Sequence, residues 1–177
     1  MNLKKLLVII FLFYFFALLQ NSFLIHFDLF GAVPNLVFIL FFLLVFFEKK
    51  DKAGQSYNNY MVLSIAIIAG TFSDIFSYIY LGISIIILII IGITLKNIQL
   101  SLMNTEENYP FVYFLPLFIV SFLVYNFALD LYIFAEEPTK IITFFSVGTI
   151  ILLIYNLFIA SVLFFIYKKG LKFFNNG

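Results

Sequence analysis

Residues 61 to 95 form one apolar run that carries a single charged side chain, Asp74. A straight α-helix of this length would be about 52 Å long, whereas the hydrocarbon core of a bilayer is about 30 Å thick. The run must therefore reverse its direction. Gly82, within the sequence YLGIS, can adopt the positive φ of a tight reversal, and we predict two helices there, at about 61–80 and 82–95.

Four further apolar segments are bounded by polar residues and lie at about 6–25, 33–47, 110–135 and 141–167. Hydrophobic residues make up 64% of the chain and charged residues only 11%, whereas a soluble domain has about 25% charged residues. We therefore expect an all-α integral membrane protein. The predicted architecture is a single transmembrane domain over residues 1–177, a six-span helical bundle whose second and fourth spans are short.

The positions of the lysines test this number of spans. Six spans with a cytoplasmic N-terminus place nine of the ten lysines on the cytoplasmic side and leave only Lys140 outside. This distribution follows the positive-inside rule, and five spans fit it less well. Lys4 and Lys5 precede the first apolar run as in a signal peptide, but that run lacks a small-residue cleavage site, so we expect it to be retained. Both termini are predicted to be cytoplasmic.

One face of the predicted third span carries small side chains next to its only charge. At 100° per residue, four small residues fall within an arc of about 60° and Asp74 lies at its edge; the four are Ala66, Gly70, Ser73 and Ser77. Such a face lets another helix approach closely, and serines can hydrogen-bond across the contact. No cation lies within a predicted span. Because a membrane charge is costly, we expect Asp74 to cap the turn that follows it, to bind a proton or ligand, or to contact a partner subunit, and we favour the capping role.

Two polar residues lie one turn apart in the predicted fifth span, toward its outer side. They are Asn126 and Asp130. We interpret Asp130 as reaching the membrane interface, and a polar contact with Asp74 inside the bundle is the alternative. At the start of the second span, Pro34 fits the first turn of a helix, where a missing N–H is tolerated, and Asn35 follows it.

No combination of residues in the sequence indicates a catalytic, metal or cofactor site. His26 and Asp28 lie in the first external loop without a third polar ligand, which is too few for a metal. Glu136 and Glu137 precede Pro138 and lack the arginine and histidines that membrane-embedded CAAX-type proteases use. Nothing assembles a nucleophile with a base or a phosphate-binding glycine loop. We expect no enzyme activity and no cofactor, and the net charge of +1 gives no indication of nucleic-acid binding.

Three stretches of the sequence, taken together, form a recognisable pattern. They are LLQNSFL (18–24) at the end of the first span, FGAVPNLVFILFFLLVFF (30–47) opening the second with Pro34-Asn35, and GTFSDIFSYIYLGIS (70–84). In this combination the chain resembles the rod shape-determining protein MreD family, in which a glycine, three residues and an aspartate are followed by a later glycine. The specific match covers residues 15 to 95.

The resemblance implies a noncatalytic scaffold subunit of the bacterial cell-elongation machinery that makes peptidoglycan. The implied partners are an MreC-like protein and, through it, the RodA polymerase, a penicillin-binding transpeptidase and the MreB filament system. On this hypothesis spans three and five dock a partner's transmembrane helix. The family is similar in fold to the S components of energy-coupling-factor vitamin transporters, and such a substrate-binding subunit is the alternative function. The first span, however, offers only Ala17 where S components carry an alanine-xxx-alanine motif.

Overall fold

The structure is a computed structural model that describes residues 3–28, 31–48, 59–77, 80–102, 111–136 and 147–175, with the side chains of 102 and 170–175 excepted. The regular secondary structure in these residues is entirely helical. The elements are α1 (Leu3–Leu18), the π-helical turn η1 (Leu19–Phe23), the 3₁₀ turn η2 (Leu24–Phe27), α2 (Leu36–Phe46), α3 (Asn59–Ser77), α4 (Ile83–Leu102), α5 (Phe111–Glu136) and α6 (Val147–Asn175).

Five helical segments in the described part of the chain are long and apolar enough to cross a membrane. They are α1 with its two following turns, α3, α4, α5 and α6, and α2 is a shorter apolar helix of 11 residues. By length and composition, the chain is a multi-pass membrane protein.

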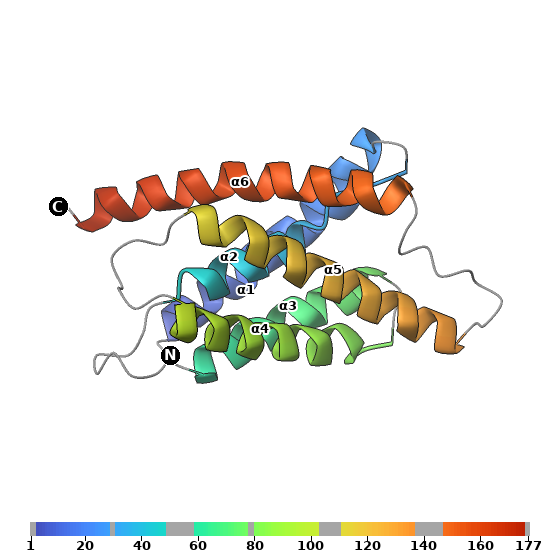
Figure 1. Cartoon of the computed structure of the whole chain (residues 1–177), viewed down its shortest axis with the longest axis horizontal. Helices are drawn as coiled ribbons and strands as arrows, with labels where there is room; N and C mark the ends of the chain where they lie inside the picture. Colours follow the sequence, from blue (N-terminus) through green and yellow to red (C-terminus); the bar gives the residue numbers. More distant parts are fainter. Residues whose placement is uncertain are drawn as a thin grey trace.

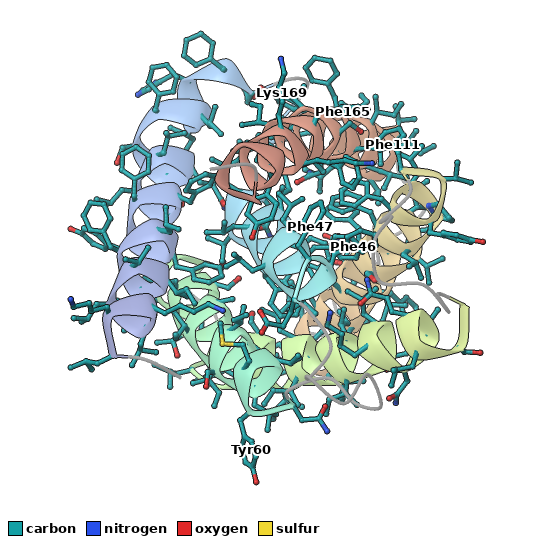
Figure 2. All side chains as sticks on the ribbon, turned by 90° about the vertical axis from the view of Figure 1, so that its left-hand side faces the viewer. Phe46, Phe47, Tyr60, Phe111, Phe165 and Lys169 are labelled. Carbon is teal, nitrogen blue, oxygen red and sulfur yellow. The ribbon has the colours of Figure 1, made fainter. Side chains whose placement is uncertain are left out.

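α2 lies in the middle of the bundle, and the other five helices surround it (Figures 1 and 2). It contacts all of them, while α1 packs on α3, α3 on α4, α4 on α5, and α5 on α6. Every α2 residue except Leu44 is buried. A helix that is apolar on all sides is suited to such a position, and at about 16 Å α2 is shorter than the hydrocarbon core.

Six phenylalanines form the contact between α2 and α5. Their spacing of four residues places three rings on one face of each helix, and the two sets interleave in antiparallel order. Phe42 of α2, for example, packs edge-on against Phe114 and Phe118 of α5, with ring centroids 5.5 and 5.1 Å apart. All six are almost completely buried: Phe38, Phe42, Phe46, Phe114, Phe118 and Phe122.

The predicted reversal of the long apolar run is confirmed. α3 ends at Ser77, α4 begins at Ile83, and Gly82 has a φ of +115°. The prediction of a short fourth span was wrong, because α4 has 20 residues and continues to Leu102. Lysine and glutamine are good helix formers, so Lys96 and the residues after it extend the helix instead of ending it. Residues 141–146, expected to begin the last span, lie outside the described residues.

The two ends of the bundle differ in charge. α1 begins and α6 ends on the left of Figure 1, and the lysines of the described helices all lie toward that end: Lys4, Lys5, Lys96, Lys168, Lys169 and Lys172. We call it the lysine end. The other end, which we call the acid end, has Asp28, Asp74, Asp130 and Glu136. At the lysine end, Lys5 Nζ lies 3.6 Å from a carboxylate oxygen of Glu48.

Candidate functional site

Asp74 binds the backbone at the start of α4. Its side chain is buried, Oδ2 accepts a hydrogen bond from the Gly82 N–H at 2.6 Å, and Oδ1 accepts one from the Ser84 N–H at 3.0 Å. N–H groups in the first turn of a helix have no acceptor within the helix, and the positive end of the helix dipole favours a carboxylate. The geometry is therefore the cap that the sequence predicted.

A hydroxyl cluster beside this cap joins three helices. The Tyr125 hydroxyl of α5 lies 2.8 Å from Ser73 Oγ of α3 and 3.4 Å from Ser84 Oγ of α4. All three side chains are buried. The polar faces of α3 and α5 thus meet each other and the beginning of α4 in the interior of the bundle.

The small face of α3 is filled by the protein's own α4. A Cβ placed on Gly70 would lie 2.5 Å from the Ile85 Cα, closer than non-bonded carbon atoms approach. Ala66 is completely buried and Ser77, the last residue of α3, is exposed. The expectation that this face docks a helix of another protein is therefore corrected, because the close approach that small residues permit is used within the chain.

The N-terminus of α2 is held by side chains from two other parts of the chain and by its own cap. Asn35 Oδ1 accepts from the Phe38 N–H at 2.9 Å, Asn156 Oδ1 of α6 accepts from the Asn35 N–H at 2.8 Å, and Gln20 Oε1 accepts from the Val37 N–H at 3.4 Å. These bonds satisfy N–H groups that a buried helix start would otherwise leave unpaired.

One expectation about this region changes, and one contact was not foreseen. Pro34 was placed in the first helical turn, but α2 begins at Leu36, because asparagine is a preferred N-cap residue and Asn35 occupies that position. The role of Gln20 was not foreseen, since it depends on the π-helical turn η1 (Leu19–Phe23) that contains it. In α6, Asn156 bonds to another segment of the chain, whereas Ser161 donates to the Leu157 carbonyl of its own helix.

The C-terminus of α2 is held by α4. Lys96 Nζ donates to the Glu48 carbonyl at 2.8 Å, and Gln99 Nε2 donates to the Phe46 carbonyl at 3.1 Å. Both side chains are buried, and the negative end of a helix favours a cation. The expectation that no cation lies within a span was wrong, because Lys96 lies inside the candidate membrane span of α4. Both ends of the short central helix are thus closed by polar side chains.

Asn126 and Asp130 of α5 do not bond to Asp74. Asn126 Nδ2 donates to the Phe122 carbonyl of its own helix at 2.8 Å. Asp130 is half-buried, and Asp74 uses its oxygens on backbone groups of residues 82 and 84. The alternative contact between Asp130 and Asp74 is therefore not formed.

Asp28, at the end of the first helical segment, closes a local turn. Its Oδ2 accepts from the Gly31 N–H at 3.1 Å, and Gly31 has a φ of +79°. Within the described ranges, no group of three or more histidine, cysteine or acidic residues could hold a metal ion.

Comparisons of the chain with protein-family models, with curated proteins and with solved structures gave no match.

Proposed function

We propose that this protein is a noncatalytic scaffold subunit of the bacterial cell-elongation complex, set in the inner membrane and docking the transmembrane helix of an MreC-like partner. The proposal includes six passes, with α2 counted as the short one, and a cytoplasmic lysine end. The position of the described lysines toward one end of the bundle supports this orientation, because cationic residues accumulate in cytoplasmic segments.

The outer half of α5 is the proposed docking surface. The observation that supports it is that the Asp130 carboxylate has no bonding partner in the described bundle. Within the described ranges, no hydrogen bond or ion pair joins Asp130 to the rest of the bundle. Phe127 and Leu131 beside it are 43% and 44% exposed. An acid at membrane depth normally pairs with another group, so a partner helix that brings a donor or a cation to Asp130 would complete this surface.

This assignment replaces the face of α3 that the sequence favoured. α4 already covers Gly70, and Ser73 is buried and bonded to Tyr125 of α5, whereas Asn126 and Asp130 are only half-buried. At 100° per residue they lie within about 40° of each other on one side of α5. The scaffold hypothesis is therefore kept, and its contact surface moves from the third span to the fifth.

Co-purification from native membranes tests the proposal. The tagged chain should capture an MreC-like or cell-wall synthesis protein, and Asp130→Leu should reduce capture about tenfold, because a hydrogen bond to a charged group is worth about 1.5–3 kcal/mol. Glu136→Leu is the matched control: it removes an exposed acid from the same helix, and capture should persist.

Two results would contradict the scaffold. One is the absence of any cell-wall synthesis protein among the captured proteins, and the other is equal capture by the Asp130→Leu variant and the unaltered chain. A thermal-shift screen with water-soluble vitamins distinguishes the transporter alternative, since stabilisation by a vitamin would identify a substrate-binding subunit.

A further inference from the structure

α1 carries an exposed apolar stripe that begins with a lysine at the lysine end. At 100° per residue, Lys4, Val8, Phe11 and Phe15 fall within an arc of about 60°. Val8 is 57% exposed, Phe11 66% and Phe15 48%, and Lys4 is exposed as well. The stripe faces the surroundings of the bundle over its whole length.

α6 repeats this pattern in the opposite chain direction. Phe158, Val162, Phe165 and Lys169 also fall within an arc of about 60°, and all four are exposed. Figure 2 shows Phe165 and Lys169 on the outer side of α6. Because α6 ends at the same end of the bundle at which α1 begins, the two lysines lie toward that end.

The length of both stripes matches one membrane leaflet. Each lysine is 11 residues from the most distant aromatic residue of its stripe, Phe15 for Lys4 and Phe158 for Lys169. This separation is about 16 Å along a helix. Half of the hydrocarbon core is about 15 Å thick. A lysine at headgroup depth therefore places the rest of its stripe along one layer of acyl chains.

The neighbouring lysines face other groups of the protein. Lys5 pairs with Glu48, and Lys168 Nζ lies 5.8 Å from the centre of the Phe164 ring. Lys4 and Lys169 are each one residue away from these, turned by about 100° around their helices. In each pair of adjacent lysines, one therefore contacts another group of the protein and the other lies at the end of an apolar stripe.

We propose that each stripe binds one anionic phospholipid, whose phosphate contacts Lys4 or Lys169 and whose acyl chain lies along the apolar side chains. Ammonium groups near the membrane surface attract anionic headgroups, and the exposed rings and methyl groups suit a hydrocarbon chain. α5 provides a contrast: Val120, Val124, Phe127 and Leu131 form an exposed stripe, but no lysine occurs between residues 111 and 136. Lipid that lies beside α5 where no partner helix covers it is therefore not selected by charge.

Native mass spectrometry of the full chain, released from nanodiscs of phosphatidylcholine and phosphatidylglycerol in equal amounts, tests this proposal. The unaltered chain should retain two phosphatidylglycerol molecules in preference to phosphatidylcholine. Lys4→Gln and Lys169→Gln should each lose one of them, with a decrease in preference of about fivefold per site, and the double variant should lose both.

The adjacent lysines supply the matched controls. Lys5→Gln and Lys168→Gln change the net charge equally at almost the same depth but leave the stripes intact, so both lipids should remain. Equal loss in these controls, or equal retention of the two lipids by the unaltered chain, would overturn the proposal. If a glutamine variant does not fold, Lys4→Arg and Lys169→Arg keep the charge and should retain the lipids, and loss in both would again contradict it. The outcome is independent of the proposed scaffold function, which rests on α5.

Discussion

Asp74 and Lys96 are both buried charged residues, and both close the end of a helix. Asp74 receives backbone N–H groups at the start of α4, and Lys96 donates to a backbone carbonyl just beyond the end of α2. Each charge lies at the helix terminus of opposite polarity. The bundle therefore uses helix ends as partners for charges that a bilayer would otherwise exclude.

The two caps differ in how well they are shielded from water. Asp74 satisfies two donors in a turn beside a buried hydroxyl cluster, whereas Lys96 reaches the carbonyl of Glu48, a residue that is itself only half-buried at the lysine end. Water can replace a lost bond at the second site more easily than at the first. We therefore expect Asp74 to contribute more to stability, and the following predictions test this difference.

The largest effect is expected for Asp74→Leu, which leaves the Gly82 and Ser84 N–H groups without an acceptor. Unsatisfied donors cost about 1–3 kcal/mol each when buried; the Ser84 donor is buried and the Gly82 donor partly buried, so the free energy of unfolding should fall by about 4 kcal/mol. Asp74→Asn keeps one acceptor and should lose about half as much. Unfolding by dodecyl sulfate in mixed micelles measures both, and equal losses for the two variants would refute the capping role.

A smaller loss is expected for Gly70→Ala, which acts on the hairpin that carries the Asp74 cap. The new Cβ would meet the Ile85 backbone at 2.5 Å, and forced separation of packed helices costs about 1–3 kcal/mol. Gly92→Ala is the control, because its Cβ would meet the Val62 Cγ1 atom at 2.8 Å, and a side chain can move. A similar destabilisation of both variants in the same titration would show that the backbone contact at Gly70 restricts α3 and α4 no more than the side-chain contact at Gly92 does.

Lys96→Met should lower the free energy of unfolding by about 1–2 kcal/mol. The change removes the donor to the Glu48 carbonyl and keeps most of the apolar stem, and a buried charge replaced by a well-packed apolar residue often has little net effect. Lys169→Met, at an exposed position, should change it by less than about 0.5 kcal/mol. A loss for Lys96→Met as large as that for Asp74→Leu would remove the difference between the two caps.

The smallest effect is expected for Tyr125→Phe, which removes the hydroxyl shared by Ser73 and Ser84 and preserves the ring that packs on Phe38 at 5.0 Å. Hydrogen bonds between membrane helices contribute about 0.6 kcal/mol each on average, so a loss of about 1 kcal/mol is expected. Tyr113→Phe, at a partly exposed position outside this cluster, should have no measurable effect. No loss for Tyr125→Phe would indicate that the hydroxyl cluster is dispensable to the Asp74 cap.

The comparison also shows which parts of the structure the sequence could predict. The Asp74 cap was predictable because its partners lie eight and ten residues away, and the length of the apolar run demanded a turn there. The Lys96 bond was not, since its partner lies 48 residues earlier, and a lysine after an apolar run is usually read as the end of a span. Local steric rules therefore gave the hairpin, but only the packed bundle shows α4 extending beyond Lys96.

The same limit applies to the small face of α3 and to α2. Glycine and serine on one face indicate a close neighbour, but the pattern does not say whether that helix belongs to the same chain, and here it is α4. The shortness of the second span was visible in the sequence. Its complete enclosure was not, because the phenylalanines of α2 look alike whether they face lipid or the rings of α5.

The enclosure of α2 has a consequence for biosynthesis. Its N-cap residue Asn35 is bonded by Asn156, which lies 121 residues later in the chain. The carbonyls at its C-terminal end accept hydrogen bonds from side chains of α4, which also follows it. While the ribosome is still making the second half of the protein, α2 has emerged with the caps from Gln20 and Asn35 but without the bonds from Lys96, Gln99 and Asn156. The remaining bonds at the two ends of α2 therefore form only after α4 and α6 have been made, so the last helix of the chain completes the central one.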